Sequence, residues 1–304
     1  MKNVAILGGS GFSGRYIINE LLKSKYSVKM INRKQSMNNF KDSCLEVVID
    51  LHSDFLHEEL KGCDCIIYNI GIIREFPKKE ISFKNLHQNL TIHAIKMAEK
   101  AGVRKFILMT ANGVDRCLTD YQRTKYNAEQ YLMNSGLDWT IFRPSVIFGN
   151  PNGRMEFCTQ VKRDMVRTPL PMPIFFSGVN IFSAGTFRMS PIHVRNVAQF
   201  FVRAINKENS NKKIYELGGG TSYSWREMLQ IISDACEKRK WSMPVPISLI
   251  KLMAFFLDRF SWFPVTRDQL TMLENGNMCE SSKYFMEYGI DEISFNVKNL
   301  NYLS

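Results

Sequence analysis

The chain has 304 residues, of which 45% are hydrophobic, and it carries a formal net charge of +11. This length and apolar fraction allow a large core and favour about two domains. The lysines and arginines are spread along the chain without a basic tail, which argues against nucleic acid and favours an anionic cofactor or an anionic lipid surface.

Strand and helix patterns alternate through the first half of the chain. Strands are predicted at 4–7, 27–32, 45–50, 64–71, 105–111 and 138–144, and helices at 12–24, 82–101 and 120–135. This alternation predicts an α/β fold with a Rossmann-type, doubly wound parallel sheet. We assign residues 1–150 to this domain, to which segments at about 187–218 return, and 151–304 mostly to a small C-terminal α/β lobe.

The later part of the chain has a looser pattern. Residues 150–192 are rich in Pro, Phe and Gly and predict loops and short elements. A helical period returns at 191–205, and a late strand is predicted at 213–219. Ser224 and Glu227 form a capping-box pattern, which predicts a helix to about residue 238.

The stretch GGSGFSG at residues 8–14 lies between the first strand and the first helix. It fits both G-x-G-x-x-G and G-x-x-G-x-x-G, in which glycines allow a tight turn and close approach of a pyrophosphate to the helix N-terminus. This context predicts a dinucleotide site. The candidate contacts in the turn are Gly8, Ser10, Gly11, Phe12 and Gly14.

The ends of the next strands predict which nucleotide binds. Asn32 and Arg33 stand where an NAD site has a carboxylate, and Arg33 can pair with a 2′-phosphate. We therefore expect NADP(H), with NAD(H) as the alternative. Asp50 is expected at the adenine amino group. Asn69, Gly71 and Pro144 end later strands and are also expected near the cofactor.

Tyr121 and Lys125 lie four residues apart on a predicted helix and therefore share one face. An ammonium beside a phenol favours the phenolate and is expected to lower its pKa, which suits proton transfer at a carbonyl or alcohol. Thr110, at the end of the preceding strand, is the candidate hydroxyl donor. The alternative interpretation of the Tyr–Lys spacing is a surface pair.

These motifs resemble the short-chain dehydrogenase/reductase superfamily in its extended or atypical branch. Longer stretches are similar to the group around the nucleotide-binding accessory subunit of respiratory complex I and its stand-alone bacterial relatives. The stretches that carry this similarity are 83–114, 137–149, 187–198, 264–273 and 289–303, and the most specific is TRDQ within 264–273.

The resemblance implies tight NADPH binding and a C-terminal lobe that closes over the cofactor, which the complex I subunit holds for structural reasons. This chain departs from that group in its intact Tyr121–Lys125 pair. It also has Arg195-Asn196 where relatives often have an acidic residue, and Thr110 where many superfamily members have Ser.

The most apolar stretch is 246–264, in which Leu249, Leu252, Met253, Phe256 and Phe260 recur at helical spacing. Charged residues interrupt it, so it is a poor membrane span. We expect a buried helix of the C-terminal lobe, with an interfacial helix touching lipid or a hydrophobic partner as the alternative.

Cellular context follows from the N-terminus and the cysteines. Met1 leads directly into a strand pattern, so no targeting segment is expected. The seven scattered cysteines predict reduced thiols and no zinc site. We expect a cytoplasmic protein that could lie at the inner face of a membrane.

Three functional hypotheses follow. The favoured one is an NADP(H)-dependent oxidoreductase that acts on a hydrophobic carbonyl or alcohol, such as a quinone- or isoprenoid-like substrate. In it Tyr121 is the acid/base, Lys125 tunes Tyr121 and holds the nucleotide ribose, and Thr110 orients the substrate oxygen. The second is a non-catalytic NADPH-binding accessory or assembly factor of a membrane respiratory complex. The third is a regulator that senses the NADP(H) ratio.

Overall fold

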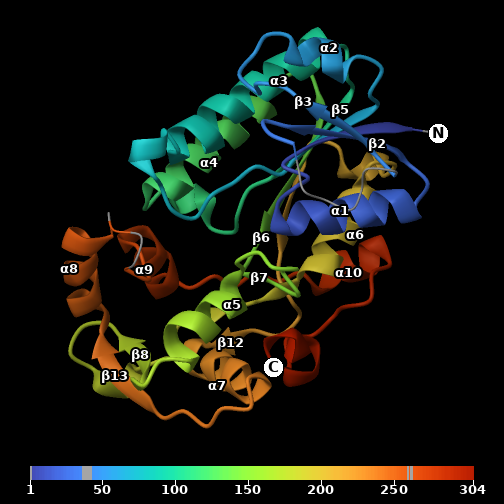
Figure 1. Ribbon diagram of the computed structural model, residues 1–304. Coiled ribbons are helices and arrows are strands. Elements are labelled where there is room, and N and C mark those ends of the chain that lie inside the picture. Colours follow the sequence, from blue (N-terminus) through green and yellow to red (C-terminus); the bar gives the residue numbers. More distant parts are fainter. Residues whose placement is uncertain (1, 36–42, 259, 261–262) are drawn as a thin grey trace. The chain divides into compact units, whose positions relative to one another are not determined.

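The computed structural model describes residues 2–35, 43–258, 260 and 263–304 (Figure 1). Contacts divide the chain into two compact units. Unit 1 comprises Met1–Pro144, Val194–Glu216 and Met286–Ile290, and unit 2 comprises Ser145–His193, Leu217–Phe285 and Asp291–Ser304.

Unit 1 is built on a seven-stranded sheet with the order β11-β6-β5-β4-β1-β2-β3. The strands are β1 (Asn3–Leu7), β2 (Ser27–Asn32), β3 (Leu45–Val48), β4 (Cys65–Tyr68), β5 (Lys105–Met109), β6 (Asp138–Pro144) and β11 (Lys213–Leu217). All pairs from β3 across to β6 are parallel. The predicted Rossmann-type α/β fold is therefore confirmed. The winding direction changes between β1 and β4, where such sheets bind ligands beyond their carboxyl ends.

Helices cover both faces of this sheet (Figure 1). On one face α1 (Phe12–Lys23) packs against α6 (Val194–Ala204). On the other, α2 (Leu56–Leu60), α3 (Leu90–Lys100) and α4 (Asp120–Met133) share a core with Ala5 and Leu7 of β1. Side chains alternate along a strand, so the completely buried Val4 and Ile6 point to the α1 face.

The helix predicted at 82–101 has two parts. It begins with a π-helical segment, η2 (Lys84–Asn89), and continues as α3. The wider π-helical turn changes which side chains point inward, a change that a 3.6-residue period does not predict. His87 lies within this π-helical segment and is only 2% exposed.

Unit 2 has its own core. Its helices are α5 (Phe157–Val161), α7 (Trp225–Ala235), α8 (Ile247–Leu257), α9 (Arg267–Glu274) and most of α10 (Ser282–Tyr288), with a π-helical segment η4 (Lys162–Val166). Its strands form the pairs β8 (Met172–Phe176) with β13 (Ser242–Pro246), β7 (Ile147–Phe148) with β10 (Ile192–His193), and β9 (Arg188–Met189) with β12 (Tyr223–Ser224).

The remaining short helices are 3₁₀ segments. They are η1 (Pro77–Lys79), η3 (Val114–Arg116), η5 (Ile181–Ser183), η6 (Glu208–Ser210) and η7 (Val297–Leu303).

Helix α7 contributes five buried side chains to the unit 2 core, namely Trp225, Met228, Leu229, Ile232 and Ala235. The predicted capping box is confirmed, since Ser224 accepts from the Glu227 N–H and Glu227 accepts in return from the Ser224 N–H. Trp225 stacks on Phe175, and its indole N–H donates to the Pro173 carbonyl at 2.9 Å. These contacts fix α7 against β8.

The expectation that the apolar segment 246–264 forms a buried helix is wrong. Helix α8 forms there, but only Ile247 and Ala254 are buried within it. Six large apolar side chains of this segment are 41–59% exposed, namely Leu249, Leu252, Met253, Phe255, Phe256 and the following Phe260. Apolar spacing predicts a helix but not how many of its faces are covered, and the unit 2 core covers α8 only on the face of Ile247 and Ala254, with Ile250 and Leu257 partly buried. Residues 259, 261 and 262 of this segment lie outside the described residues. Within the residues that the structure describes, no helix is long and apolar enough to cross a membrane.

Candidate active site

The glycine-rich turn joins β1 to α1 at the carboxyl edge of the sheet. Gly8 has φ of +88°, and a Cβ there would lie 2.7 Å from the Asn69 carbonyl oxygen. A Cβ at Gly14 would lie 2.3 Å from the Gly8 carbonyl oxygen. These two glycines are therefore required by the packing of the turn itself.

Gly11 differs from these glycines. A Cβ there would meet only the Gly8 carbonyl oxygen, at 3.3 Å, among the described residues. Gly11 is the N-cap of α1, where the described side chains provide no cap and the first turn has no acidic residue. Free N–H groups and the positive end of the helix dipole suit an anion. The turn therefore fits the pyrophosphate of a dinucleotide, with Ser10 and Phe12 beside Gly11.

Three residues are predicted near the adenosine part of the cofactor. One of them links two strands, and the other two are exposed. Asn32 is buried, and its Nδ2 donates to Glu46 Oε1 at 2.9 Å, so its amide links β2 to β3. Arg33 is exposed just beyond β2. Asp50 is also exposed, and its Oδ1 accepts from the His52 N–H at 3.1 Å.

Asn69 and Gly71 follow β4 and border the site. The Ser13 hydroxyl donates to Asn69 Oδ1 at 3.1 Å, and Asn69 Nδ2 donates to the Gly8 carbonyl at 3.5 Å, so Asn69 supports the glycine-rich turn. A Cβ at Gly71 would lie 3.4 Å from Lys125 Nζ. The structure thus brings the segment after β4 together with the Tyr–Lys helix. Pro144, at the end of β6, is buried, and its carbonyl accepts from the Asn112 N–H.

Tyr121 and Lys125 lie on the inner face of α4. Thr119 caps this helix by accepting from the Gln122 N–H, which fixes where the helix begins. Lys125 is 6% exposed, and its Nζ lies 5.6 Å from the Tyr121 ring centroid. The alternative of a solvated surface pair is therefore wrong.

The expected lowering of the Tyr121 pKa is also wrong for the protein without ligand. Desolvation by surrounding atoms raises the pKa of Tyr121 to about 12. Burial likewise lowers the pKa of Lys125 to about 8, against the nearby charge of Glu129, which raises it. Sequence spacing shows that the two groups are neighbours, but it does not include the cost of removing both from water.

His87 is a site residue that the sequence did not predict. Its ring contacts the Tyr121 ring edge-on at 5.2 Å, and its Nε2 accepts from the Ile72 N–H at 3.0 Å. Burial is the main cause that lowers the pKa of His87 to about 2, followed by the charge of Lys125. The imidazole is therefore neutral, and it holds the segment after Gly71 against Tyr121.

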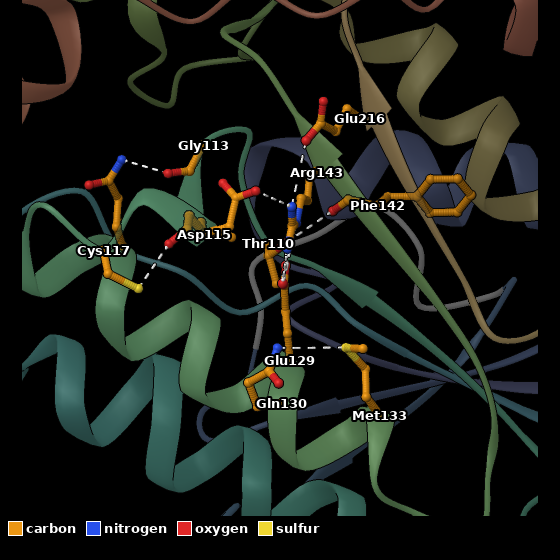
Figure 2. A network of polar contacts seen from close by, with 12 residues as sticks. Thr110, Gly113, Asp115, Cys117, Glu129, Gln130, Met133, Phe142, Arg143 and Glu216 are labelled. Atoms are coloured by element: carbon orange, nitrogen blue, oxygen red, sulfur yellow. Dashed lines mark hydrogen bonds and ion pairs between the residues drawn. The ribbon is translucent and has the colours of Figure 1, made fainter. Parts of the chain in front are cut away.

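Thr110 belongs to a buried polar network (Figure 2). Its hydroxyl donates to Glu129 Oε1 at 2.5 Å. Glu129 is fully buried, and it accepts from Arg143 Nε and from Arg143 Nη2, the latter at 2.6 Å. Arg143 also pairs with Asp115 at 3.1 Å and with Glu216 at 3.5 Å. The Thr110 proton is thus engaged by the Glu129 carboxylate, so the expectation that Thr110 is a hydroxyl donor at the site is wrong for the protein without ligand. Its oxygen is left as an acceptor.

The network links elements that are distant in the sequence. Glu129 is on α4, Arg143 on β6, Asp115 on η3 and Glu216 on β11. The one signal that could have indicated Glu129 is its position four residues after Lys125, on the face that carries the Tyr–Lys pair.

Comparison with known proteins identifies the family of the chain. The model of an NAD(P)H-binding family matches residues 8–168. The chain belongs to this NAD(P)H-binding family. Its predicted place near the extended short-chain dehydrogenases and the complex I accessory subunits is confirmed by its relatives.

One relative of this chain is the mitochondrial NADH-ubiquinone oxidoreductase 40 kDa subunit of Neurospora crassa. It is 23% identical to this chain over 94% of this chain and 74% of the relative. Another relative is the decarboxylating sterol-4-alpha-carboxylate 3-dehydrogenase of Dictyostelium discoideum. It is 24% identical to this chain over 94% of this chain and 92% of the relative. The solved structure of MoeE5 with UDP-glucuronic acid and NAD is similar with a TM-score of 0.74, at 16% identity, over 99% of this chain and 98% of that one. At this identity the last likeness shows the fold alone.

Proposed function

We propose that this NAD(P)H-binding protein is an NADP(H)-dependent oxidoreductase acting on a hydrophobic carbonyl, alcohol or quinone-related substrate. The observation that carries the proposal is the pair formed by the half-buried Tyr121 and the buried Lys125 at the carboxyl edge of the sheet, next to the segment after β4. A bound nicotinamide would supply or accept the hydride.

Each side chain of the pair has a distinct role in this proposal. Tyr121 donates a proton to, or accepts one from, the substrate oxygen. Lys125 in its ammonium form holds the nucleotide ribose and stabilises the phenolate when it forms. With a pKa of about 8, Lys125 is largely charged near neutral pH. Thr110, whose oxygen can accept, orients the substrate hydroxyl.

The preference for NADP(H) rests on Arg33. Its exposed position just beyond β2 leaves the guanidinium available to a 2′-phosphate. Gly8, Gly11 and Gly14 would shape the pyrophosphate site, and Asp50 would face the adenine. NAD(H) remains the competing cofactor in any titration.

A pair of variants tests the enzyme proposal before a substrate is known. Gly11→Val removes nucleotide binding, and Tyr121→Phe removes only the acid/base group. The expected result is that neither variant restores growth to a deletion strain. Full complementation by Tyr121→Phe but not by Gly11→Val would overturn the enzyme proposal and support a structural role of the nucleotide.

The second candidate is an accessory factor at a membrane complex, and the exposed apolar side chains of α8 favour it. The 40 kDa relative from Neurospora is itself a subunit of such a complex. In this case the protein co-fractionates with membranes, and Gly11→Val releases it. A soluble protein that responds only to the NADP(H) ratio would instead indicate the third hypothesis, a redox-sensing regulator.

A further inference from the structure

Helix α4 presents three side chains in a row to the interior of unit 1. Tyr121, Lys125 and Glu129 follow one another at intervals of four residues and therefore share one face. The proposed chemistry uses the first two. Glu129 is fully buried and lies one helical turn beyond Lys125.

Glu129 joins α4 to the carboxyl ends of two strands. One of its oxygens accepts from the Thr110 hydroxyl, just beyond β5, at 2.5 Å. Both oxygens accept from Arg143 of β6, at distances from 2.6 to 3.2 Å. These strand ends lie on the edge that carries the glycine-rich turn, so the carboxylate fixes the rotation of α4 relative to the site.

The charges along this network alternate in sign. The positive charge of Lys125 interacts with the negative charge of Glu129. Glu129 in turn accepts hydrogen bonds from the positively charged Arg143 (Figure 2). Arg143 in turn meets Asp115 and Glu216, which are about half exposed. The two outer carboxylates offset part of the Arg143 charge, so that Glu129 keeps part of its effect on Lys125.

We propose that Glu129 is a positioning residue that keeps the buried Lys125 in its ammonium form and, through Arg143 and Thr110, fixes α4 at the site. The proposal rests on the proposed oxidoreductase function only where it gives the Lys125 ammonium a role in binding and catalysis. The charge state of Lys125 itself can be measured without a ligand. Among the described residues, the phenol of Tyr121 and the neutral imidazole of His87 also face Lys125.

The titration of Lys125 in the ligand-free protein tests the proposal directly. Competitive labelling of amines with acetic anhydride across a pH series, read peptide by peptide by mass spectrometry, gives the midpoint of Lys125. In the wild type we expect this midpoint near the pKa of about 8. Glu129→Gln should lower it by about one pH unit, because a carboxylate at one-turn spacing is lost in a medium of low polarity.

Two further variants grade the effect. Asp115→Asn leaves Arg143 to neutralise Glu129 more completely and should lower the midpoint by a smaller amount. Asp120→Asn is the matched control, since its carboxylate is on the same helix but exposed and paired with Arg123. Its midpoint should equal that of the wild type. A Glu129→Gln midpoint equal to that of the control would overturn the proposal.

Glu129→Gln leaves Arg143 with only its outer partners and can prevent folding. The double variant Glu129→Gln/Arg143→Gln removes both charges from the interior and avoids this problem. Its Lys125 midpoint should still lie below the wild-type value, because the nearer of the two charges is the carboxylate. An unchanged or raised midpoint in the folded double variant would contradict the proposal.

NADPH titration separates this inference from the proposed function. At pH 8 about half of Lys125 is charged in the wild type and about a tenth would be after a shift of one unit, so NADPH affinity should fall about fivefold in Glu129→Gln. If the labelling midpoint shifts and the affinity does not, the role of Glu129 stands and the contact of Lys125 with the nucleotide is wrong. If the midpoint does not shift, the inference itself is wrong.

Discussion

Two glycines of the same turn have different tasks at the residue scale. A Cβ at Gly14 would meet backbone at 2.3 Å, whereas a Cβ at Gly11 meets only one carbonyl oxygen at 3.3 Å among the described residues. The sequence motif contains both and does not distinguish them. Gly14 is needed for the packing of the turn, whereas Gly11 leaves room for a ligand.

This difference predicts opposite phenotypes. Gly11→Val should abolish NADPH binding with little change in thermal stability, because the added methyl groups occupy the space of the pyrophosphate. Gly14→Ala should cost about 1–3 kcal/mol of unfolding free energy, the range for overpacking. Thermal unfolding and NADPH fluorescence titration measure the two effects. Normal NADPH binding by a folded Gly11→Val protein would mean that the motif is only a turn.

Arg33 carries the proposed cofactor preference. Arg33→Ala should weaken NADPH binding by about 1.5–3 kcal/mol, the range for a hydrogen bond to a charged group, and leave NADH binding nearly unchanged. Parallel fluorescence titrations with both nucleotides measure the ratio, and Lys34→Ala is the neighbouring basic control. A ratio unchanged by Arg33→Ala would show that the NADP(H) preference is wrong.

The candidate site could be predicted from the sequence where its parts are local. The glycine-rich turn lies within seven residues, and Tyr121 and Lys125 are one helical turn apart. The bond between Glu129 and Arg143 joins residues 14 positions apart, and the bond between Ile72 and His87 joins residues 15 apart. Such contacts depend on which strands become neighbours and on the π-helical turn of η2, which no local period encodes.

At the scale of elements, the central strands and helices follow from their apolar periods, whereas the environment of α8 does not. Its spacing predicts a helix, and the structure leaves most of its large side chains exposed. Whether an apolar helix is covered depends on how much core the other elements have already filled. The exposed face of α8 is the feature on which the accessory hypothesis depends.

Substitutions on α8 test that feature. Phe255 and Phe256 are 57% and 58% exposed, so Phe255→Ser/Phe256→Ser should cost little stability while reducing binding to anionic lipid vesicles. Sedimentation with vesicles and thermal unfolding measure the two effects. The control is Leu170→Ser, which removes an exposed apolar side chain from another part of unit 2. Equal vesicle binding by all three proteins would remove the support that α8 gives to a membrane role.

At the scale of the whole molecule, the buried His87 links the site to acid stability. Its pKa is lowered to about 2, so the folded state favours the neutral ring. A base with a depressed pKa contributes stability that is fully present above its unfolded value of about 6.5 and is lost as the pH falls below it. The burial of Lys125 changes the unfolding free energy only between its folded pKa of about 8 and its higher unfolded pKa. This range lies above the pH range in which His87 acts.

The lowered pKa of His87 predicts a measurable dependence of the unfolding free energy on pH. Between pH 6.5 and pH 5 the wild type should lose about 2 kcal/mol of unfolding free energy that His87→Gln does not lose, since one pKa unit corresponds to about 1.4 kcal/mol. Urea unfolding at the two pH values measures this difference. His52→Gln, which alters an exposed histidine, should keep the wild-type slope. The same slope in His87→Gln would contradict a neutral, buried imidazole.

The most direct test of the proposed oxidoreductase activity is the rate at which the protein oxidises NADPH in the presence of a panel of hydrophobic carbonyl compounds and quinones. The wild type should turn over at least one of them. Tyr121→Phe should lower this rate by about 10²- to 10⁴-fold, the range for general acid/base catalysis, with nearly unchanged NADPH affinity. Lys125→Met should lower both the rate and the affinity. A Tyr121→Phe rate equal to that of the wild type, or no oxidation with any compound of the panel, would contradict the proposed enzyme.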